Sequence, residues 1–172
     1  DGDGDLDAMI TNVQSTNTVW INDGTGIFTD SGQELGSSDS REVVLGDLDG
    51  DGDLDAIFAK PPSPNSVWIN DGDGIFTDTG QELGSNTSRS VVLGDLDMDG
   101  DLDAVFANTN QPNSVWINDG FGNFINHGEG FGDNNSRKVV LGDLDGDGDL
   151  DIIFANRSNQ PNTNWINNCT SE

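Results

Sequence analysis

Apolar residues fall along this chain in short runs, separated by clusters of Gly, Asp, Asn and Pro. Four such runs follow one another at Val43–Gly46, Leu54–Ala59, Ser66–Asn70 and Ile75–Glu82. Runs of this length between turn-forming residues are typical of β-strands, and no segment shows a helical period of useful length. The sequence Asn-Asp-Gly-Asp-Gly at 70–74 predicts a tight hairpin, because Asn, Asp and Gly tolerate positive φ.

This pattern repeats along the chain. The segment Val43–Asp49 returns as Val91–Asp97 and as Val139–Asp145, 48 residues later each time. The same period relates Trp20, Trp68 and Trp116, then Phe28, Phe76 and Phe124, and also Arg41, Arg89 and Arg137, while Trp165 follows Trp116 after 49 residues. Four strands in a unit of this length predict an all-β fold of β-propeller-type blades. A β-solenoid is the competing geometry, although its coils are usually shorter.

We expect one repeat array over residues 1–172, with units at about 1–36, 37–84, 85–132 and 133–172. The first unit lacks its first strand and the last unit lacks its closing strand, which leaves 14 strands in about 3.5 blades. Propellers close with about four to eight blades. Two explanations stay open. The chain is a fragment of a longer propeller, or copies associate head to tail into a ring or filament.

The charge of the chain excludes some classes of partner. There are 32 acidic and 6 basic residues, for a formal net charge of −26. This charge excludes a surface that follows nucleic-acid phosphates and disfavours anionic membranes. No apolar run approaches the ~20 residues of a membrane span. Strong acidity can also mean disorder, but four Trp, eight Phe and the regular apolar runs argue against it.

Most of the acidic residues lie in nine-residue loops after the first strand of each unit, at loop positions 1, 3, 5, 7 and 9. They are Asp47, Asp49, Asp51, Asp53 and Asp55; Asp95, Asp97, Asp99, Asp101 and Asp103; and Asp143, Asp145, Asp147, Asp149 and Asp151. A fourth loop keeps Asp1, Asp3, Asp5 and Asp7 but lacks the first acid. Five like charges in nine residues repel one another, so a folded loop must neutralise them.

A hard cation with six to eight oxygen ligands would do so, and carboxylates suit calcium far better than zinc. Gly52, Gly100 and Gly148 at loop position 6 allow the chain to turn so that the carboxylates converge. Position 7 would offer its carbonyl while its side chain faces solvent, and the leucines at positions 2 and 8 would anchor the loop in the core. We predict three Ca²⁺ sites, and a fourth at residues 1–7 only if another group supplies the missing ligand.

An EF-hand is excluded. That motif needs an acidic residue at loop position 12, where this chain has Phe58, Phe106 or Phe154, and it needs flanking helices where this chain has strands.

The pattern Asp-x-Asp-x-Asp-Gly-Asp-x-Asp, followed by a strand and Asn-Asp-Gly-x-Gly-x-Phe, resembles the FG-GAP/VCBS repeat, which also builds the β-propeller of integrin α-subunits. The resemblance implies seven-bladed propellers, calcium in loops on one face, and adhesion or recognition outside the cell. It also implies metal ligands at Asp47, Asp49, Asp51, the carbonyl of Asp53 and Asp55, and at the matching positions 48 and 96 residues later.

Three functions are considered. A secreted or cell-surface module, rigidified by calcium, would serve adhesion, recognition or assembly with a protein or glycan partner; this is favoured because every notable residue recurs with the structural period. A calcium-dependent, lectin-like glycan binder is the alternative. An enzyme such as a lyase or hydrolase needs a non-repeated acid, base and nucleophile, and the chain offers only His127, Cys169 and scattered Lys and Arg.

The remaining notable residues are expected to have structural roles. His127 is expected in a surface loop and Cys169 as an inert thiol. The Trp series is expected in the core, with stacking on sugars as the alternative. The Arg series is expected in ion pairs with carboxylates of a neighbouring loop, and a role in binding a substrate stays open. Four segments match the N-glycosylation acceptor pattern, at Asn86, Asn134, Asn156 and Asn168. They matter only if the protein is secreted by a cell with that machinery.

Overall fold

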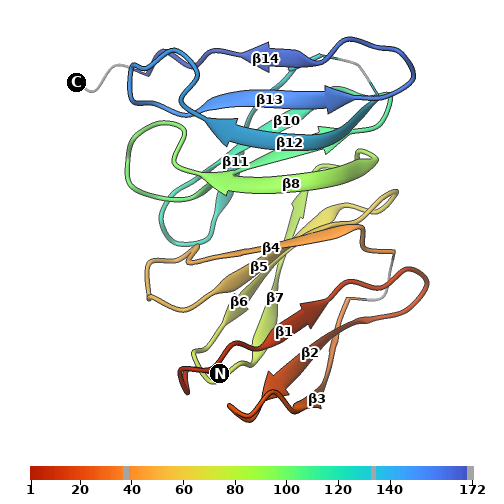
Figure 1. Cartoon of the computed structure of the whole chain (residues 1–172), viewed down its shortest axis with the longest axis vertical. Helices are drawn as coiled ribbons and strands as arrows, with labels where there is room; N and C mark the ends of the chain where they lie inside the picture. The colour runs from red at the N-terminus through yellow and green to blue at the C-terminus, as the bar shows by residue number, and fades with distance from the viewer. Residues whose placement is uncertain (37–38, 133–134, 170–172) are drawn as a thin grey trace.

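A computed structural model describes residues 1–36, 39–132 and 135–169, which contain 14 β-strands in four antiparallel sheets and no helix (Figure 1). The first sheet contains β1 (Ala8–Ile10), β2 (Asn17–Asn22) and β3 (Phe28–Leu35). The second contains β4 (Glu42–Gly46), β5 (Asp55–Ala59), β6 (Asn65–Asn70) and β7 (Phe76–Leu83). The third contains β8 (Ser88–Gly94), β9 (Asp103–Asn108), β10 (Ser114–Asn118) and β11 (Phe124–Glu129). The fourth contains β12 (Ser136–Gly142), β13 (Asp151–Asn156) and β14 (Thr163–Trp165).

Within each sheet the strands pair in chain order, so each sheet is a simple meander with the geometry of a propeller blade. The predicted all-β fold of blade-like units of about 48 residues is therefore confirmed, with four strands in the second and third sheets and three described strands in the first and fourth. In the second unit the observed strands begin and end within one residue of those expected from the apolar runs. The described residues contain no helix long and apolar enough to cross a membrane.

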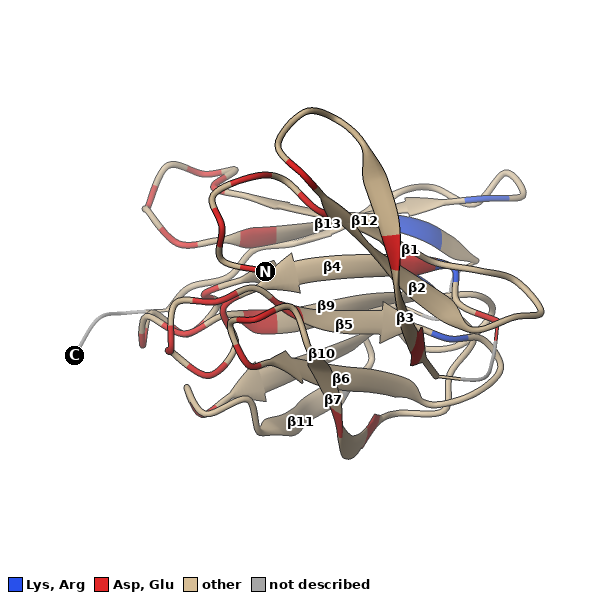
Figure 2. Cartoon of the chain, turned by 90° about the horizontal axis from the view of Figure 1, so that it is seen from below, with Lys and Arg blue, Asp and Glu red and all other residues tan. Residues whose placement is uncertain are grey.

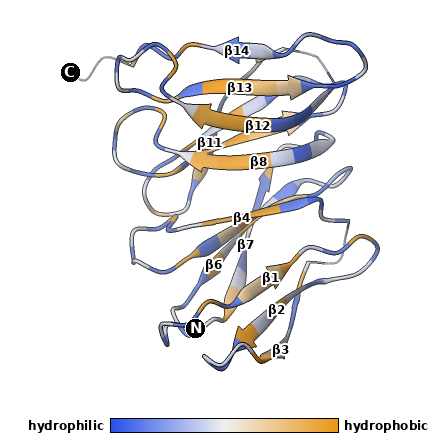
Figure 3. Cartoon of the chain, in the orientation of Figure 1, coloured by the Kyte–Doolittle hydropathy of each residue, from blue (hydrophilic) through white to orange (hydrophobic). Residues whose placement is uncertain are grey.

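The blades stack face to face along the long axis of the molecule (Figure 1). Their first strands lie nearest a common axis, since β8 contacts both β4 and β12. Apolar residues of adjacent blades pack in three clusters, and Figure 3 shows hydrophobic residues along the inner strands β4, β8 and β12. Between the second and third blades Ile57 and Val67 pack with Val91, Phe106 and Phe124. The core of the molecule is thus a series of layers between blades.

Close packing between inner strands requires a glycine at the end of β4 and at the end of β8. Leu93 and Leu102 of the third blade lie against Gly46 of the second, where an added Cβ would sit 2.7 and 2.8 Å from their δ-carbons. Leu141 and Leu150 lie in the same way against Gly94. Here the absence of a side chain, rather than backbone freedom, explains the glycine.

The first blade has no inner strand to place against the second. Leu45 is 42% exposed and Leu54 55% exposed, and with Ile21 and Phe76 they line a cavity of about 430 Å³ between these blades. At the other end of the array Leu144 is 45% exposed. The prediction that every leucine at loop positions 2 and 8 anchors its loop in the core is therefore wrong for Leu54 and Leu144, because no described inner strand or blade covers either side chain.

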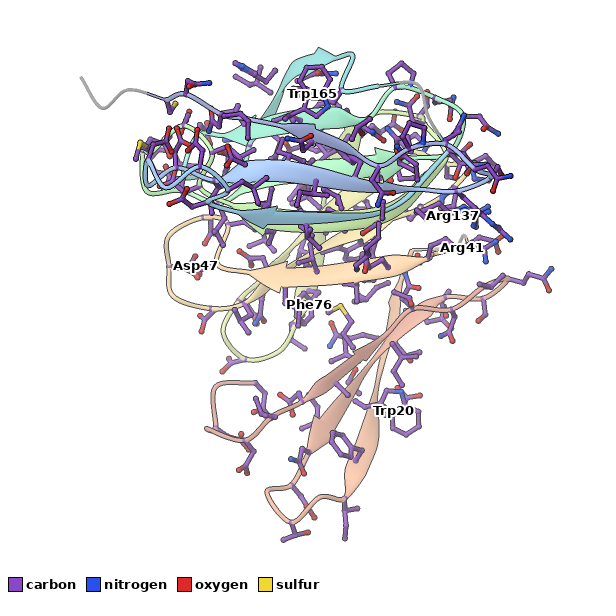
Figure 4. The ribbon with its side chains drawn as sticks, turned by 45° about the horizontal axis from the view of Figure 1, so that its top comes forward. Trp20, Arg41, Asp47, Phe76, Arg137 and Trp165 are labelled. Atoms are coloured by element: carbon purple, nitrogen blue, oxygen red, sulfur yellow. The ribbon has the colours of Figure 1, made fainter. Side chains whose placement is uncertain are left out.

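The tryptophans differ in burial although they share a repeat position. Trp68 is 8% exposed and meets Phe58 edge to face, while Trp20 and Trp116 are half-buried. Trp165, labelled in Figure 4, is 40% exposed and lies edge to face with Phe131. The core prediction is confirmed for Trp68 and wrong for Trp165, because the fourth blade has no described neighbour beyond β14.

Candidate metal centres

The Asp-rich loops of the second, third and fourth blades connect the first and second strands of their blades, so they gather on one side of the stack of blades (Figure 2). Three loops each bring three carboxylates together, with ligand oxygens within 4.8 Å of one another. The groups are Asp47, Asp49 and Asp55; Asp95, Asp97 and Asp99; and Asp143, Asp145 and Asp151. Two loops therefore join positions 1, 3 and 9, and the third joins positions 1, 3 and 5.

The glycine at position 6 turns each loop as expected. Gly52, Gly100 and Gly148 have φ values of 98°, 99° and 99°, in the left-handed region that glycine enters without strain. In the second blade the N–H groups of Gly50 and Gly52 donate to the two carboxylate oxygens of Asp47, at 2.8 and 3.0 Å. The position 1 carboxylate thus also closes the loop on itself.

The position 9 aspartates have a second role that the sequence did not reveal. Asp103 is fully buried, and its two oxygens accept hydrogen bonds from the N–H groups of Leu96 at 2.8 Å and Asn118 at 2.9 Å. Asp55 and Asp151 accept the equivalent pairs. Burial, with the charges of Asp97 and Asp99 adding to it, raises the pKa of Asp103 to about 6. These carboxylates therefore fasten the loop to the third strand of its blade.

The sequence also did not reveal that asparagines at the end of the third strand connect adjacent blades, although Asn70 and Asn118 recur with the 48-residue period. The amide Nδ2 of Asn118 donates to the carbonyl of Leu48, in the preceding blade's loop, at 2.8 Å. Asn167 donates in the same way to the carbonyl of Leu96 at 2.7 Å. Each Asp-rich loop of the second and third blades is therefore held by the blade that follows it.

The position 7 side chains point away from the carboxylate groups. The carboxylate of Asp53 lies against the hairpin at Gly72, where an added Cβ would be 2.5 Å from its Oδ2, and Asp101 faces Gly120 in the same way. Asp149 accepts the N–H of Cys169 at 2.8 Å. This orientation agrees with a role for the carbonyl alone, although these side chains contact hairpins where solvent was expected. Asp51 and Asp147, at position 5, also lie outside the three groups.

The first loop does not form such a group among the described residues. Asp7, at its position 9, accepts the N–H of Asn22 at 2.8 Å and the terminal ammonium of Asp1 at 2.7 Å. Burial alone would raise the pKa of Asp7, but the ammonium and the Asn22 N–H hold it below its usual value. Asp3 and Asp5 remain exposed.

The donor set fits a hard cation. All candidate side-chain ligands are carboxylate oxygens, which calcium prefers and zinc does not. Burial and then the neighbouring Asp charges raise the pKa of both Asp49 and Asp97. The Oδ1 atom of Asp95 is buried without a hydrogen-bond partner within the described part of the chain. A cation would satisfy that oxygen and remove the repulsion that raises these pKa values.

The prediction that the repeated arginines form ion pairs with carboxylates of a neighbouring Asp-rich loop is wrong. Arg41, Arg89 and Arg137 lie at the opposite end of the inner strands from the Asp-rich loops; Figure 4 labels Arg41, Arg137 and Asp47. Between them runs a strand of five to seven residues, at about 3.3 Å per residue. Neither ion pair that the described residues form, Lys138 with Glu42 and the terminal ammonium with Asp7, includes an arginine.

His127 and Cys169 line a cavity of about 230 Å³ between the third and fourth blades, together with Trp165. His127 is exposed, as predicted, but belongs to strand β11 and not to a loop. Burial, then the charges of nearby aspartates, raises the pKa of Cys169, which lowers the fraction of thiolate at neutral pH. In the preceding interface Phe124, from the fourth strand of the third blade, belongs to the packed core, whereas the described part of the fourth blade has three strands.

The glycosylation pattern stays a prediction. The Nδ2 atoms of Asn86 and Asn156 donate to the carbonyls of Pro112 and Pro161, and Asn168 is exposed. Asn134 lies outside the described residues.

Comparison with known proteins supports the repeat assignment. The FG-GAP-like repeat family matches the chain three times, over residues 1–58, 47–106 and 95–154. No curated protein matches it. Among solved structures, a mutant form of the Tc holotoxin pore of Photorhabdus luminescens is similar, with a TM-score of 0.53 and 19% identity. The match covers 95% of this chain and 8% of that one. At this identity the similarity shows the fold alone.

Proposed function

The chain belongs to the FG-GAP-like repeat family, and from that premise we propose that it is a non-enzymatic module whose Asp-rich loops bind Ca²⁺. The observation that carries the proposal is the convergence of three carboxylates in each of three loops, at one end of the blades. Aspartates at loop positions 1, 3 and 9 form the group in the second and fourth blades, and those at positions 1, 3 and 5 form it in the third blade.

In this proposal Asp47, Asp49 and Asp55 hold the ion in the second blade, with Asp51 and the carbonyl of Asp53 as further ligands. The matching residues act in the third and fourth blades. The bound ion supplies positive charge where the loop concentrates negative charge. The loop is then connected to the sheet by hydrogen bonds within the chain, since the Asp103 carboxylate accepts the N–H groups of Leu96 and Asn118. Ordering a loop therefore also orders its strand pair.

Binding of the ion also bears on contacts between blades. The carbonyls of Leu48 and Leu96, which lie inside the loops, accept hydrogen bonds from Asn118 and Asn167 of the next blade. A loop splayed by repulsion would lose both its internal hydrogen bonds and these contacts. Calcium is therefore proposed to rigidify the whole array.

Calorimetric titration with CaCl₂, paired with thermal melts in calcium and in chelator, tests the proposal. We expect three bound ions per chain and a large rise in melting temperature with calcium. Each site that binds only the folded state adds about 2.7 kcal/mol when the free ion concentration is 100-fold above Kd. A melt that is the same in chelator and in calcium would overturn the proposal.

Two isosteric variants separate site binding from general charge. Asp97→Asn removes one carboxylate from the third-blade group, and Asp73→Asn removes the same charge from an exposed hairpin of the second blade. We expect Asp97→Asn to reduce the number of bound ions to two or to weaken one site at least about tenfold, while Asp73→Asn retains three sites. Equal effects of the two variants would show that the ions are only a diffuse atmosphere.

The proposed setting is extracellular, at a cell surface or in a secreted assembly, where the module serves adhesion, recognition or structure. Several of the grouped carboxylates are exposed, which suits weak sites filled by extracellular calcium at about 10⁻⁴–10⁻³ M. Glycan-array screening with and without chelator distinguishes this module from the lectin-like alternative, which requires calcium-dependent signals.

The larger assembly is part of the same proposal. Leu45 and Leu54 face a place where another inner strand would fit, and they support either a longer propeller or head-to-tail association. Sedimentation of the chain in calcium separates the two. A concentration-dependent increase in mass supports association, and a compact monomer at all concentrations supports a fragment.

A further inference from the structure

The basic residues of this acidic chain lie together, away from the Asp-rich loops. Figure 2 shows Asp and Glu concentrated at the loop end of the blades and Lys and Arg toward the other end. Four of the six basic residues are Arg41, Arg89, Arg137 and Arg157. Their charges act on one another, because the guanidinium groups of Arg137, Arg41 and Arg157 contribute, after burial, to lowering the pKa of Arg89.

Three of these arginines lie at the start of inner strands. Arg41 directly precedes β4, and Arg89 and Arg137 are the second residues of β8 and β12. Because β8 contacts both β4 and β12, the three arginines come from adjacent strands around the common axis. Arg157 follows β13 in the fourth blade, and its N–H donates to the carbonyl of Asn135 at 2.9 Å.

The backbone places Arg89 and Arg137 at irregularities of their sheets. Ser88 pairs with Asn108 and Ser90 pairs with Ala107, so Arg89 has no partner residue and forms a β-bulge. Arg137 forms the same bulge, between Ser136 opposite Asn156 and Lys138 opposite Ala155. The N–H of Arg41 donates to the carbonyl of Ala59, the residue that pairs with Glu42. Such bulges redirect a side chain out of the regular alternation.

Buried hydrogen bonds hold the residue before each arginine. The amides of Asn17, Asn65 and Asn113 donate to the hydroxyls of Ser40, Ser88 and Ser136, at 2.9, 3.0 and 3.1 Å. Each of these bonds joins one blade to the next. The arginines therefore project from a rigid, repeated framework and not from free loops.

No carboxylate neutralises the cluster within the described residues. The nearby Glu42 is occupied, since its carboxylate pairs with Lys138 and accepts the N–H of Val91 at 2.8 Å. The Nε atom of Arg89 reaches only the Thr109 hydroxyl at 3.4 Å, and the Nε atom of Arg137 is buried without a hydrogen-bond partner. Clustered like charges with unused donors call for a counter-ion.

We propose that Arg41, Arg89, Arg137 and Arg157 form an oxyanion-binding site at the end of the inner strands opposite the Asp-rich loops. The ligand is a tetrahedral oxyanion group, a sulfate or a phosphate ester. Guanidinium groups present planar donor forks that match such oxygens, and they stay charged at every physiological pH. The site is independent of the proposed calcium sites, because a different set of residues at the other end of the strands builds it.

Calorimetric titration with sodium sulfate and, separately, with glucose 6-phosphate tests the site, with sodium chloride at the same ionic strength as the reference. We expect saturable binding of one or both oxyanions and none of chloride. Binding of sulfate alone, of the phosphate ester alone or of both identifies the preferred group. The absence of saturable binding by either oxyanion would overturn the proposal.

Arg89→Gln removes the central charge, and Lys60→Gln removes a positive charge outside the cluster. We expect Arg89→Gln to weaken oxyanion binding at least about tenfold and Lys60→Gln to leave it unchanged. Arg89→Lys keeps the charge without the fork and should recover only part of the affinity. If Arg89→Gln does not fold, Arg137→Gln replaces it. Equal binding by the folded arginine variants and the original chain would refute the assignment.

Discussion

The glycine that ends each inner strand provides a sharp test of how the blades pack. In Gly94→Ala the new methyl carbon would sit 2.6 Å from Cδ1 of Leu141 and 2.8 Å from Cδ1 of Leu150. Carbon atoms pack best at about 3.5–4.0 Å, so both leucines must retreat by about 1 Å. Gly142, at the same position in the fourth blade, has no heavy atom within 4 Å of such a carbon. The two substitutions are chemically identical and differ only in the neighbouring blade.

The expected magnitudes follow from two terms. Replacing glycine by alanine within a strand favours folding by about 0.5–1 kcal/mol, because the unfolded chain loses freedom. Overpacking costs about 1–3 kcal/mol, and we expect about 2 kcal/mol here because two leucine side chains must rotate away. Gly142→Ala should therefore stabilise the chain slightly, and Gly94→Ala should destabilise it by about 1 kcal/mol. The difference of about 2 kcal/mol corresponds to roughly 4–8 °C in melting temperature for a chain of this size.

Thermal and urea unfolding of both variants, at one saturating calcium concentration, measures this difference. Gly46→Ala should repeat the result of Gly94→Ala, because Leu93 and Leu102 lie at 2.7 and 2.8 Å from its added carbon. Shortening a crowding side chain, as in Leu150→Val, should partly relieve the Gly94→Ala variant. Equal stability of Gly94→Ala and Gly142→Ala would refute the packing of blades described above.

Two further predictions concern the Asp-rich loops. Met98, at position 4 of its loop, has a φ of 64° where the other loops have glycine, and its side chain is 45% exposed. Met98→Gly removes this backbone strain, so it should raise the free energy of unfolding in urea by on the order of 1 kcal/mol. A lower free energy of unfolding would contradict this prediction. In chelator the stability should fall as pH rises from 4 to 7. The pKa of Asp103 is about 6 in the folded state and near 3.9 in the unfolded state, so the folded state binds this proton more tightly. The free energy of unfolding therefore decreases by as much as about 3 kcal/mol once the pH exceeds 6. Melts at several pH values in EDTA test the sign, and a melting temperature that rises over this interval would show it to be wrong.

Much of the fold is readable from the sequence because its signals are local. A strand of this protein is a short apolar run, and a turn is a cluster of Asn, Asp and Gly, so the residues that specify each element lie within it. The 48-residue period then multiplies a single blade. The strands of the second unit were placed almost to the residue, and the Gly at loop position 6 has the predicted positive φ.

The carboxylate groups that could hold a metal ion were predictable from the sequence only in part. Alternating Asp residues identify the loops, but the sequence could not show that Asp103 lies outside the closest group while Asp55 and Asp151 belong to theirs. Nor could it show that position 9 is buried and bonded to the third strand. These properties depend on where the third strand of the same blade runs, which no loop residue specifies.

The sequence by itself determined the repeated blade and the acidic loops, because hydrophobic alternation, turn chemistry and charge spacing act over a few residues. Only the tertiary structure decided which residues at the same repeat position share the same environment. Trp68 is buried and Trp165 exposed, Leu102 is packed and Leu54 open, and Gly94 is crowded where Gly142 is free. Burial and close packing are set by the neighbouring blade, and the arginines of separate repeats meet only because the inner strands of successive blades lie side by side.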